Sequence, residues 1–163
     1  IAAGLVTLKA IVREAGYRTK MAVYCEDGNI DPVGACVGNR GMRVNAIVSE
    51  LGGEKIDIIP WCQDTLEFIA RALSPAKVSM VEATEDEKVA KVVVDDNMLS
   101  LAIGKDGQNA RLAARLTGWK IDVKSYSAYM KSKMEEETQL TSEVTESDKP
   151  EEFDGEEELG ELD

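Results

Sequence analysis

The sequence predicts an α+β fold in which two small domains of the same design stand in tandem and lead into an acidic tail. The main observation is an internal repeat, because a Gly-x-x-Gly motif between two apolar helical segments occurs at residues 38–41 and again at 104–107. Each motif is followed by a helical pattern and by a strand that begins with Lys-Ile-Asp, at Lys55 and at Lys120. In a chain of 163 residues, a repeat of this length favours two domains.

The charge of the chain is unevenly distributed. Residues 131–163 contain 14 acidic and 3 basic residues, which leaves 17 acidic and 16 basic residues in positions 1–130. The formal net charge of −12 therefore belongs almost entirely to the C-terminal part, and the folded part can still present a basic surface. Few large apolar residues follow Tyr129, so we expect a disordered tail. The expected boundaries are 1–60 for the first domain, 61–125 for the second and 126–163 for the tail.

Several classes of chemistry are excluded by residue types that are rare or absent. The chain has no histidine, which excludes Ser-His and Cys-His dyads and histidine-liganded metals. Cys25, Cys36 and Cys62 form no Cys-x-x-Cys pair, so free thiols in a reducing compartment are expected rather than disulfides or zinc ligands. No apolar run approaches the ~18 residues of a membrane span, and there is no signal segment. We therefore expect a cytoplasmic protein with no metal, no cofactor and no membrane partner.

The first copy of the repeat is expected to begin with a β-hairpin. Apolar and β-branched residues fill positions 5–13, a turn follows at 14–16, and 17–25 form the second strand. Asp31 and Pro32 then supply an N-cap and a first helical position for a short helix. After Gly41, apolar residues recur at helical spacing, and the copy ends in a strand at 56–59.

The second copy is expected to have the order helix, strand, strand, helix, loop, helix, strand. The expected helices are 63–73, 98–103 and 108–117, and the expected strands are 77–83, 88–94 and 119–123. Asp95 and Asp96 are expected to cap the helix at 98 rather than to act in catalysis. The first copy lacks a counterpart of helix 63–73, and Ile1 is not a plausible translation start. We therefore expect the chain to begin within a longer protein.

The two Gly-x-x-Gly loops point to a ligand that carries phosphates. Glycine lets the backbone adopt positive φ angles and approach another chain without an intervening Cβ. The helix that follows each loop presents free N–H groups and the positive end of its dipole to whatever lies there. One such loop alone could be a simple turn between helices, but its duplication in the same context favours binding. Neither loop has the pattern of a P-loop or of a dinucleotide-binding motif.

The loops and the order of elements resemble the KH module in its type II, bacterial arrangement, whose loop clamps about four nucleotides of single-stranded nucleic acid. The likeness extends to long strings of sequence. DPVGACVGNRG at 31–41 and GEKIDII at 53–59 are similar to the first KH domain of the NusA family of bacterial transcription termination and antitermination factors. AIGKDGQNARLAARLTGWKID at 102–122 resembles the second KH domain of that family. The resemblance covers residues 4–124 and does not extend into the tail.

This resemblance implies two tandem type II KH domains that bind single-stranded nascent RNA. It implies a non-enzymatic factor that works with RNA polymerase and other transcription factors, mainly through upstream domains; a monomer is expected. RNA contacts are then expected from both loops and from the first turn of the helix behind each. The expected residues are Gly38, Asn39, Arg40, Gly41 and Arg43 in the first domain, and Gly104, Lys105, Gly107, Gln108, Asn109 and Arg111 in the second.

Other functions stay open from the sequence alone. KH domains also accompany RNA-processing enzymes and ribosome-associated proteins, and a catalytic domain of such a protein would lie outside this chain. A protein-interaction scaffold whose loops no longer bind RNA is a further alternative. The tail is expected either to compete with RNA for the basic surface, or only to add solubility or to bind another protein.

Overall fold

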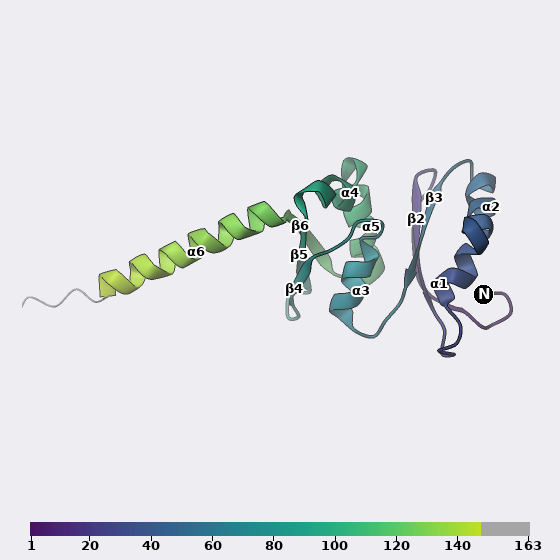
Figure 1. The fold of residues 1–163 in the computed structure, drawn as a ribbon, viewed down its shortest axis with the longest axis horizontal. Coiled ribbons are helices and arrows are strands. Elements are labelled where there is room, and N and C mark those ends of the chain that lie inside the picture. Colours follow the sequence, from purple (N-terminus) through teal and green to yellow (C-terminus); the bar gives the residue numbers. More distant parts are fainter. Residues whose placement is uncertain (148–163) are drawn as a thin grey trace, which may run out of the picture. The chain divides into compact units, whose positions relative to one another are not determined.

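The computed structural model describes residues 1–147, with side chains described up to residue 144. The chain forms two compact units, Ile1–Tyr129 and a second unit that begins at Met130. The first unit contains two three-stranded sheets with their helices (Figure 1). None of the described helices is both long and apolar enough to cross a membrane.

The first domain has the expected hairpin, two helices and a final strand. Its elements are β1 (Thr7–Glu14), β2 (Arg18–Tyr24), α1 (Pro32–Val37), the 3-10 turn η1 (Asn39–Gly41), α2 (Met42–Glu50) and β3 (Lys55–Pro60). Strand β2 pairs antiparallel with β1 and parallel with β3. Asp31 caps α1 as expected, because its carboxylate accepts a 3.1 Å hydrogen bond from the backbone N–H of Val33.

The second domain repeats this topology and adds a helix in front. Its elements are α3 (Thr65–Ala72), β4 (Met80–Thr84), β5 (Val89–Val94), η2 (Asp96–Met98), α4 (Leu99–Ile103), η3 (Lys105–Gly107), α5 (Gln108–Thr117) and β6 (Lys120–Ser125). Strand β5 pairs antiparallel with β4 and parallel with β6. The predicted order of helices and strands is therefore confirmed.

Asp95 stands at the predicted N-cap position, in front of η2, but the predicted capping by its side chain is not formed. Neither carboxylate accepts a hydrogen bond from the start of the following helix. Instead the hydroxyl of Ser79 donates to Asp95, and the backbone N–H and hydroxyl of Ser127 donate to Asp96. These partners come from other elements that the fold brings close to the end of β5, and a local sequence pattern does not reveal them.

The two domains share one hydrophobic core. Helix α5 of the second domain packs against β1 and β2 of the first, and α3 packs against β3. Ala22 and Ile59 from the first sheet are fully buried in the same cluster as Ile69 and Leu73 from the second domain. Domains of about 60 residues bury little surface on their own. The shared core therefore makes the pair one structural unit.

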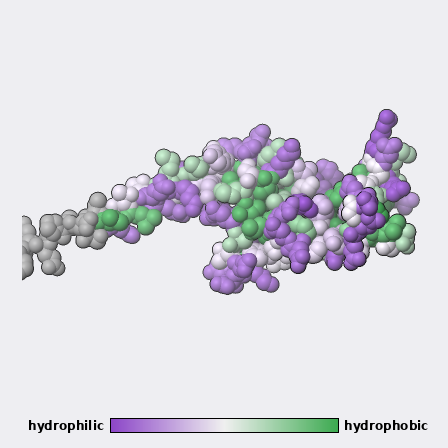
Figure 2. All heavy atoms as spheres, turned by 60° about the horizontal axis from the view of Figure 1, so that its bottom comes forward, coloured by the Kyte–Doolittle hydropathy of each residue, from purple (hydrophilic) through white to green (hydrophobic). Residues whose placement is uncertain are grey.

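The first domain contains an apolar cavity of about 410 Å³ between its sheet and α1 and α2. Residues that line it include Met21, Val44, Ile47 and Ile58. In the second domain α3 packs beside α5, which is the counterpart of α2. The first domain lacks an equivalent of α3 in this chain, in agreement with the repeat. Figure 2 shows hydrophobic atoms in the middle of the body and, interspersed with hydrophilic ones, at the end where α1 and α2 lie.

Residues after β6 form a long helix where disorder is expected. In helix α6 (Tyr126–Ser147), 12 of the 22 residues are Glu, Lys, Met, Gln, Ala or Leu, the types with high helix propensity. Low apolar content argues against a packed core, but it does not prevent a single helix that exposes its side chains. Met134 and Leu140 are accordingly 65% and 62% exposed. The remainder of the expected tail, residues 148–163, lies outside the described residues.

Candidate nucleic-acid interface

The two Gly-x-x-Gly loops have the same backbone conformation. The φ angles of the first and last glycines are 77° and 74° at Gly38 and Gly41, and 78° and 72° at Gly104 and Gly107. The third loop residue is also left-handed, with φ of 54° at Arg40 and 55° at Asp106. A left-handed arginine or aspartate is uncommon. The same left-handed conformation occurs at these two equivalent positions although the side chains differ. The two loops therefore share one backbone path.

The first glycine of each loop is required by close packing. A Cβ added at Gly38 would lie 2.7 Å from Cγ of Arg43, and one added at Gly104 would lie 2.8 Å from the backbone nitrogen of Asn109. Any larger residue would also be strained at these positive φ angles. Each loop therefore runs tightly over the start of the helix that follows it.

The helices behind the loops begin without a side-chain cap. The N-caps of α2 and α5 are Gly41 and Gly107, which have no side chain to accept hydrogen bonds from the first turn. The first N–H groups of a helix have no partner within the helix, and the positive end of the dipole adds to their attraction for anions. Both loops therefore present backbone donors to an incoming phosphate.

In the first loop the exposed side chains are Asn39 and Arg40. Arg40 makes no ion pair with any described residue, so its charge is available. Arg43 is also exposed, but its Nη1 donates a 2.7 Å hydrogen bond to the carbonyl of Ala35 in α1. Arg43 thus ties the two helices of the loop together, and part of its donor capacity is already used.

In the second loop only Lys105 is an exposed cation without an ion pair among the described residues. Two side-chain donors on the first turn of α5, Gln108 and Arg111, are held by Glu14 from β1. Gln108 Nε2 donates to its carboxylate at 2.8 Å, and Arg111 donates at 2.6 Å from Nε and 3.1 Å from Nη2. The hydrogen bond from Arg111, followed by that from Gln108, lowers the pKa of Glu14 to about 2. A phosphate would have to compete with Glu14 for both side chains.

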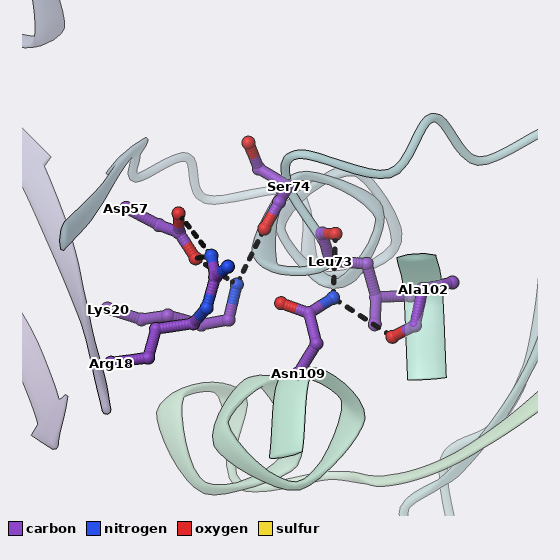
Figure 3. Close-up of polar contacts among 7 residues, drawn as sticks. All are labelled: Arg18, Lys20, Asp57, Leu73, Ser74, Ala102 and Asn109. Carbon is purple, nitrogen blue, oxygen red and sulfur yellow. Dashed lines mark hydrogen bonds and ion pairs between the residues drawn. The ribbon is translucent and has the colours of Figure 1, made fainter. Parts of the chain in front are cut away.

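Asn109 does not take part in this surface, contrary to the expectation from sequence. Its side chain is only 3% exposed, and Nδ2 donates to the carbonyls of Leu73 and Ala102 at 3.0 and 2.9 Å (Figure 3). Asn109 therefore joins the ends of α3 and α4 inside the fold. Position 109 follows the loop in sequence, but it lies on the face of α5 that points into the core.

Some basic residues near the domain junction form hydrogen bonds and ion pairs with other parts of the fold. Lys20 is fully buried, and its Nζ donates to Asp57 at 2.8 Å and to the carbonyl of Ser74 at 2.7 Å (Figure 3). Burial lowers the pKa of Lys20, while Asp57 opposes that shift. Arg18 pairs with the same carboxylate at 2.6 Å. Because Ser74 belongs to the second domain, this network helps to hold the domains together.

A groove of about 370 Å³ lies between the domains beside the second loop. Its walls include Tyr17 and Lys55 from the first domain and Leu101, Gly104, Lys105 and Gln108 from the second. Glu14, Tyr17 and Lys55 were not expected at this surface, because nothing in the local sequence indicates that the first domain approaches this loop.

The described residues offer no evident place for a metal. Within residues 1–147 there is no group of three side chains of the types that ligate metals. Cys25, Cys36 and Cys62 are free thiols, each partly buried. Cys36 lines the apolar cavity of the first domain and behaves there as a small apolar side chain.

Comparison with known families agrees with this geometry. The family of NusA-like first KH domains matches residues 1–61, and that of NusA-like second KH domains matches residues 65–131. The chain belongs to the NusA-like tandem KH family. It is 60% identical over 124 residues to the transcription termination/antitermination protein NusA of Halalkalibacterium halodurans, covering 76% of this chain and 32% of that protein. With NusA of Bacillus subtilis it is 62% identical over 122 residues, covering 75% and 33%.

The matched region is a part of these relatives. The chain spans about a third of the length of the curated NusA proteins named above. Among solved structures, the crystal structure of APE1850 is similar with a TM-score of 0.52 over 73% of this chain and 88% of that one. Because the two sequences are only 20% identical, this likeness supports the fold alone.

Proposed function

We propose that this chain binds single-stranded RNA through its two Gly-x-x-Gly loops. The observation that carries the proposal is the equal backbone conformation of the loops, each in front of a helix that begins without a side-chain cap. Each loop thus combines backbone N–H donors, the positive end of a helix dipole and one cation that makes no ion pair with a described residue. This cation is Arg40 in the first domain and Lys105 in the second, and we propose that a phosphate of the RNA binds there. A KH loop of this kind holds about four nucleotides of a single strand.

The shared core supports binding of one strand by both domains. Since α3 and α5 pack against the first sheet, the two loops are held at a fixed separation. A strand that is bound at one loop is then already near the other, and tandem binding could gain ~10²-fold or more over one domain. A strand too short to reach both loops would lose this gain.

The wider role is proposed from the family. The relatives are named as transcription termination/antitermination proteins. We propose that this chain is the RNA-binding part of a non-enzymatic factor that works with RNA polymerase on nascent RNA in the cytoplasm, and that it acts as a monomer. Contacts with the polymerase and with other factors are assigned mainly to parts of the protein outside this chain.

The test is a fluorescence anisotropy titration with single-stranded RNA and with the same sequence as a duplex, each at two salt concentrations. We expect the single strand to bind more tightly, and its affinity to fall as salt rises, because phosphate contacts release counterions. Equal affinity for the duplex would contradict recognition by KH loops. Absence of binding at low salt would favour a protein-interaction scaffold.

A further inference from the structure

The groove between the domains is lined by residues from both of them. One wall comes from the β1–β2 turn and the start of β3 in the first domain, and the other comes from α4 and the second loop. The groove therefore adjoins the backbone of Gly104, where the proposed RNA path crosses the second domain. Residues of the first domain can thus contact a strand held by the second loop.

Tyr17 supplies an exposed aromatic ring on the first wall. Its side chain is 65% exposed and makes no hydrogen bond or ring contact with any described residue. Its backbone is fixed on both sides, since its N–H donates to the carbonyl of Glu14 at 3.0 Å and its carbonyl accepts from the N–H of Lys55 at 3.1 Å. The ring is therefore presented from a rigid turn, which limits the entropy lost when a base stacks on it.

The charges in the groove favour a phosphate. Arg18 is paired with Asp57, and Glu14 is paired with Arg111, so these groups largely compensate one another. Lys55 and Lys105 are exposed on opposite walls and make no ion pair with any described residue. The unbalanced charge of the groove is thus positive and comes from both domains.

One further feature suits a base rather than an inorganic anion. Leu101 is 43% exposed and gives the groove an apolar surface. A ligand with a flat apolar face and a phosphate meets Tyr17, Leu101 and the two lysines at once.

We propose that this groove binds one nucleotide of the RNA strand held by the second loop, with its base stacked on Tyr17 and its phosphate between Lys55 and Lys105. The inference rests on the proposed RNA binding and makes the first domain part of the second domain's site. Base stacking on an aromatic side chain tolerates any base, because every base has a π face. Tyr17 therefore adds affinity without selecting a sequence.

The first experiment compares variants of exposed tyrosines in anisotropy titrations with a single-stranded RNA of about 12 nucleotides, long enough for both loops and the groove. Tyr17→Ala is expected to weaken binding about 10-fold, whereas Tyr17→Phe, which keeps the ring, stays within about twofold of the wild type. Tyr126→Ala is the matched control, because Tyr126 is 52% exposed and does not line the groove. Circular dichroism confirms that each variant is folded.

Two further readouts separate stacking from a general loss of binding. RNA carrying 2-aminopurine at successive positions is expected to show one position whose fluorescence is quenched by the wild type and by Tyr17→Phe but not by Tyr17→Ala. Lys55→Gln is expected to lower the slope of log affinity against log salt by about 1, as the loss of one phosphate contact predicts.

The outcomes distinguish the inference from the proposed function. If Tyr17→Ala binds RNA like the wild type while substitutions in the loops weaken binding, the groove site is wrong and the loop function stands. A loss with Lys55→Gln but not with Tyr17→Ala would indicate a phosphate contact without a stacked base, and it would overturn the site as proposed. If the wild type binds no RNA, or if substitutions in the loops leave RNA affinity unchanged, the proposed function itself is overturned.

Discussion

Glu14 in the first domain accepts a 2.6 Å hydrogen bond from Nε of Arg111 in the second. The same carboxylate also accepts from Gln108, so it holds two of the three polar side chains on the first turn of α5. This turn lies directly behind the second Gly-x-x-Gly loop. The contact therefore fixes the position of the first domain against a surface that we expect to meet RNA.

Replacing Glu14 tests whether this contact competes with RNA. Glu14→Gln keeps the shape of the side chain but removes the charge that holds Arg111. We expect RNA affinity to rise about threefold at low salt, with a smaller gain at high salt where charge interactions are screened. Anisotropy titration measures the change, with Glu85→Gln in the β4–β5 turn as the matched control. Weaker binding would instead mean that Glu14 positions α5 for the RNA.

Substitution of Asn109 separates a structural contact from an RNA contact. Asn109→Ala removes two buried hydrogen bonds, to the carbonyls of Leu73 and Ala102, and we expect a loss of about 2 kcal/mol in unfolding free energy. RNA affinity of the folded variant should change little. Asn39→Ala, at an exposed loop position, should show the reverse pattern. Urea denaturation measures the stability and anisotropy measures the RNA affinity. An Asn109→Ala variant that is as stable as the wild type but binds RNA more weakly would show that Asn109 contacts RNA.

Acid should destabilise the protein through Glu14 and Glu54. Glu54 is buried and accepts hydrogen bonds from Arg13, from the hydroxyl of Thr19 and from the backbone N–H of Gly16. The bond from Arg13, then that from Thr19, lowers the pKa of Glu54 to about 2, similar to the value at Glu14. Because both groups have an ordinary pKa of 4.5, the unfolded state takes up protons first as the pH falls.

The stabilisation from these carboxylates is therefore complete above about pH 4.5 and is lost as the pH falls toward 2. Urea unfolding measured across this range should show the decline. Glu54→Gln should be less stable than the wild type at neutral pH and should lose less stability on acidification. Parallel pH curves for the two proteins would show that Glu54 does not contribute to the acid response.

The sequence predicted the secondary structure well because its signals are local. Asp31 and Pro32 mark the start of α1, and the β-branched residues of β5 mark a buried strand. The glycines at 38 and 104 likewise mark loops whose φ angles are positive. Each of these features depends on neighbouring residues only.

Contacts between distant parts of the chain were not predictable in the same way. The pairing of Glu14 with Arg111 joins positions 97 residues apart, and no spacing rule links them. The burial of Asn109 depends on where α3 packs, although its sequence position suggests a loop contact. The groove at Tyr17 requires both domains to be placed against each other. The two Gly-x-x-Gly loops could therefore be found from the sequence, but the residues that surround them could not.

Removal of the acidic C-terminal residues tests whether they compete with RNA. Residues 131–163 carry 14 acidic and 3 basic residues and are tethered to the RNA-binding unit. We expect truncation after Tyr129 to raise RNA affinity at low salt, because a tethered anionic segment has a high local concentration. The difference between the truncated and full chains should shrink as salt rises. Identical binding at low salt would exclude competition and assign the tail to solubility or to a partner.

The most direct test of the account is the effect of new negative charge in the two loops. Asn39→Asp with Arg40→Asp changes the first loop, Lys105→Asp changes the second, and Lys88→Asp in the exposed β4–β5 turn is the control. Each loop variant is expected to bind single-stranded RNA about 10-fold or more weakly, and the combined variant should show no binding at ~0.15 M salt. The circular dichroism spectra and the affinity of the control should not change. Unaltered RNA affinity in the correctly folded combined variant would contradict RNA binding by the loops.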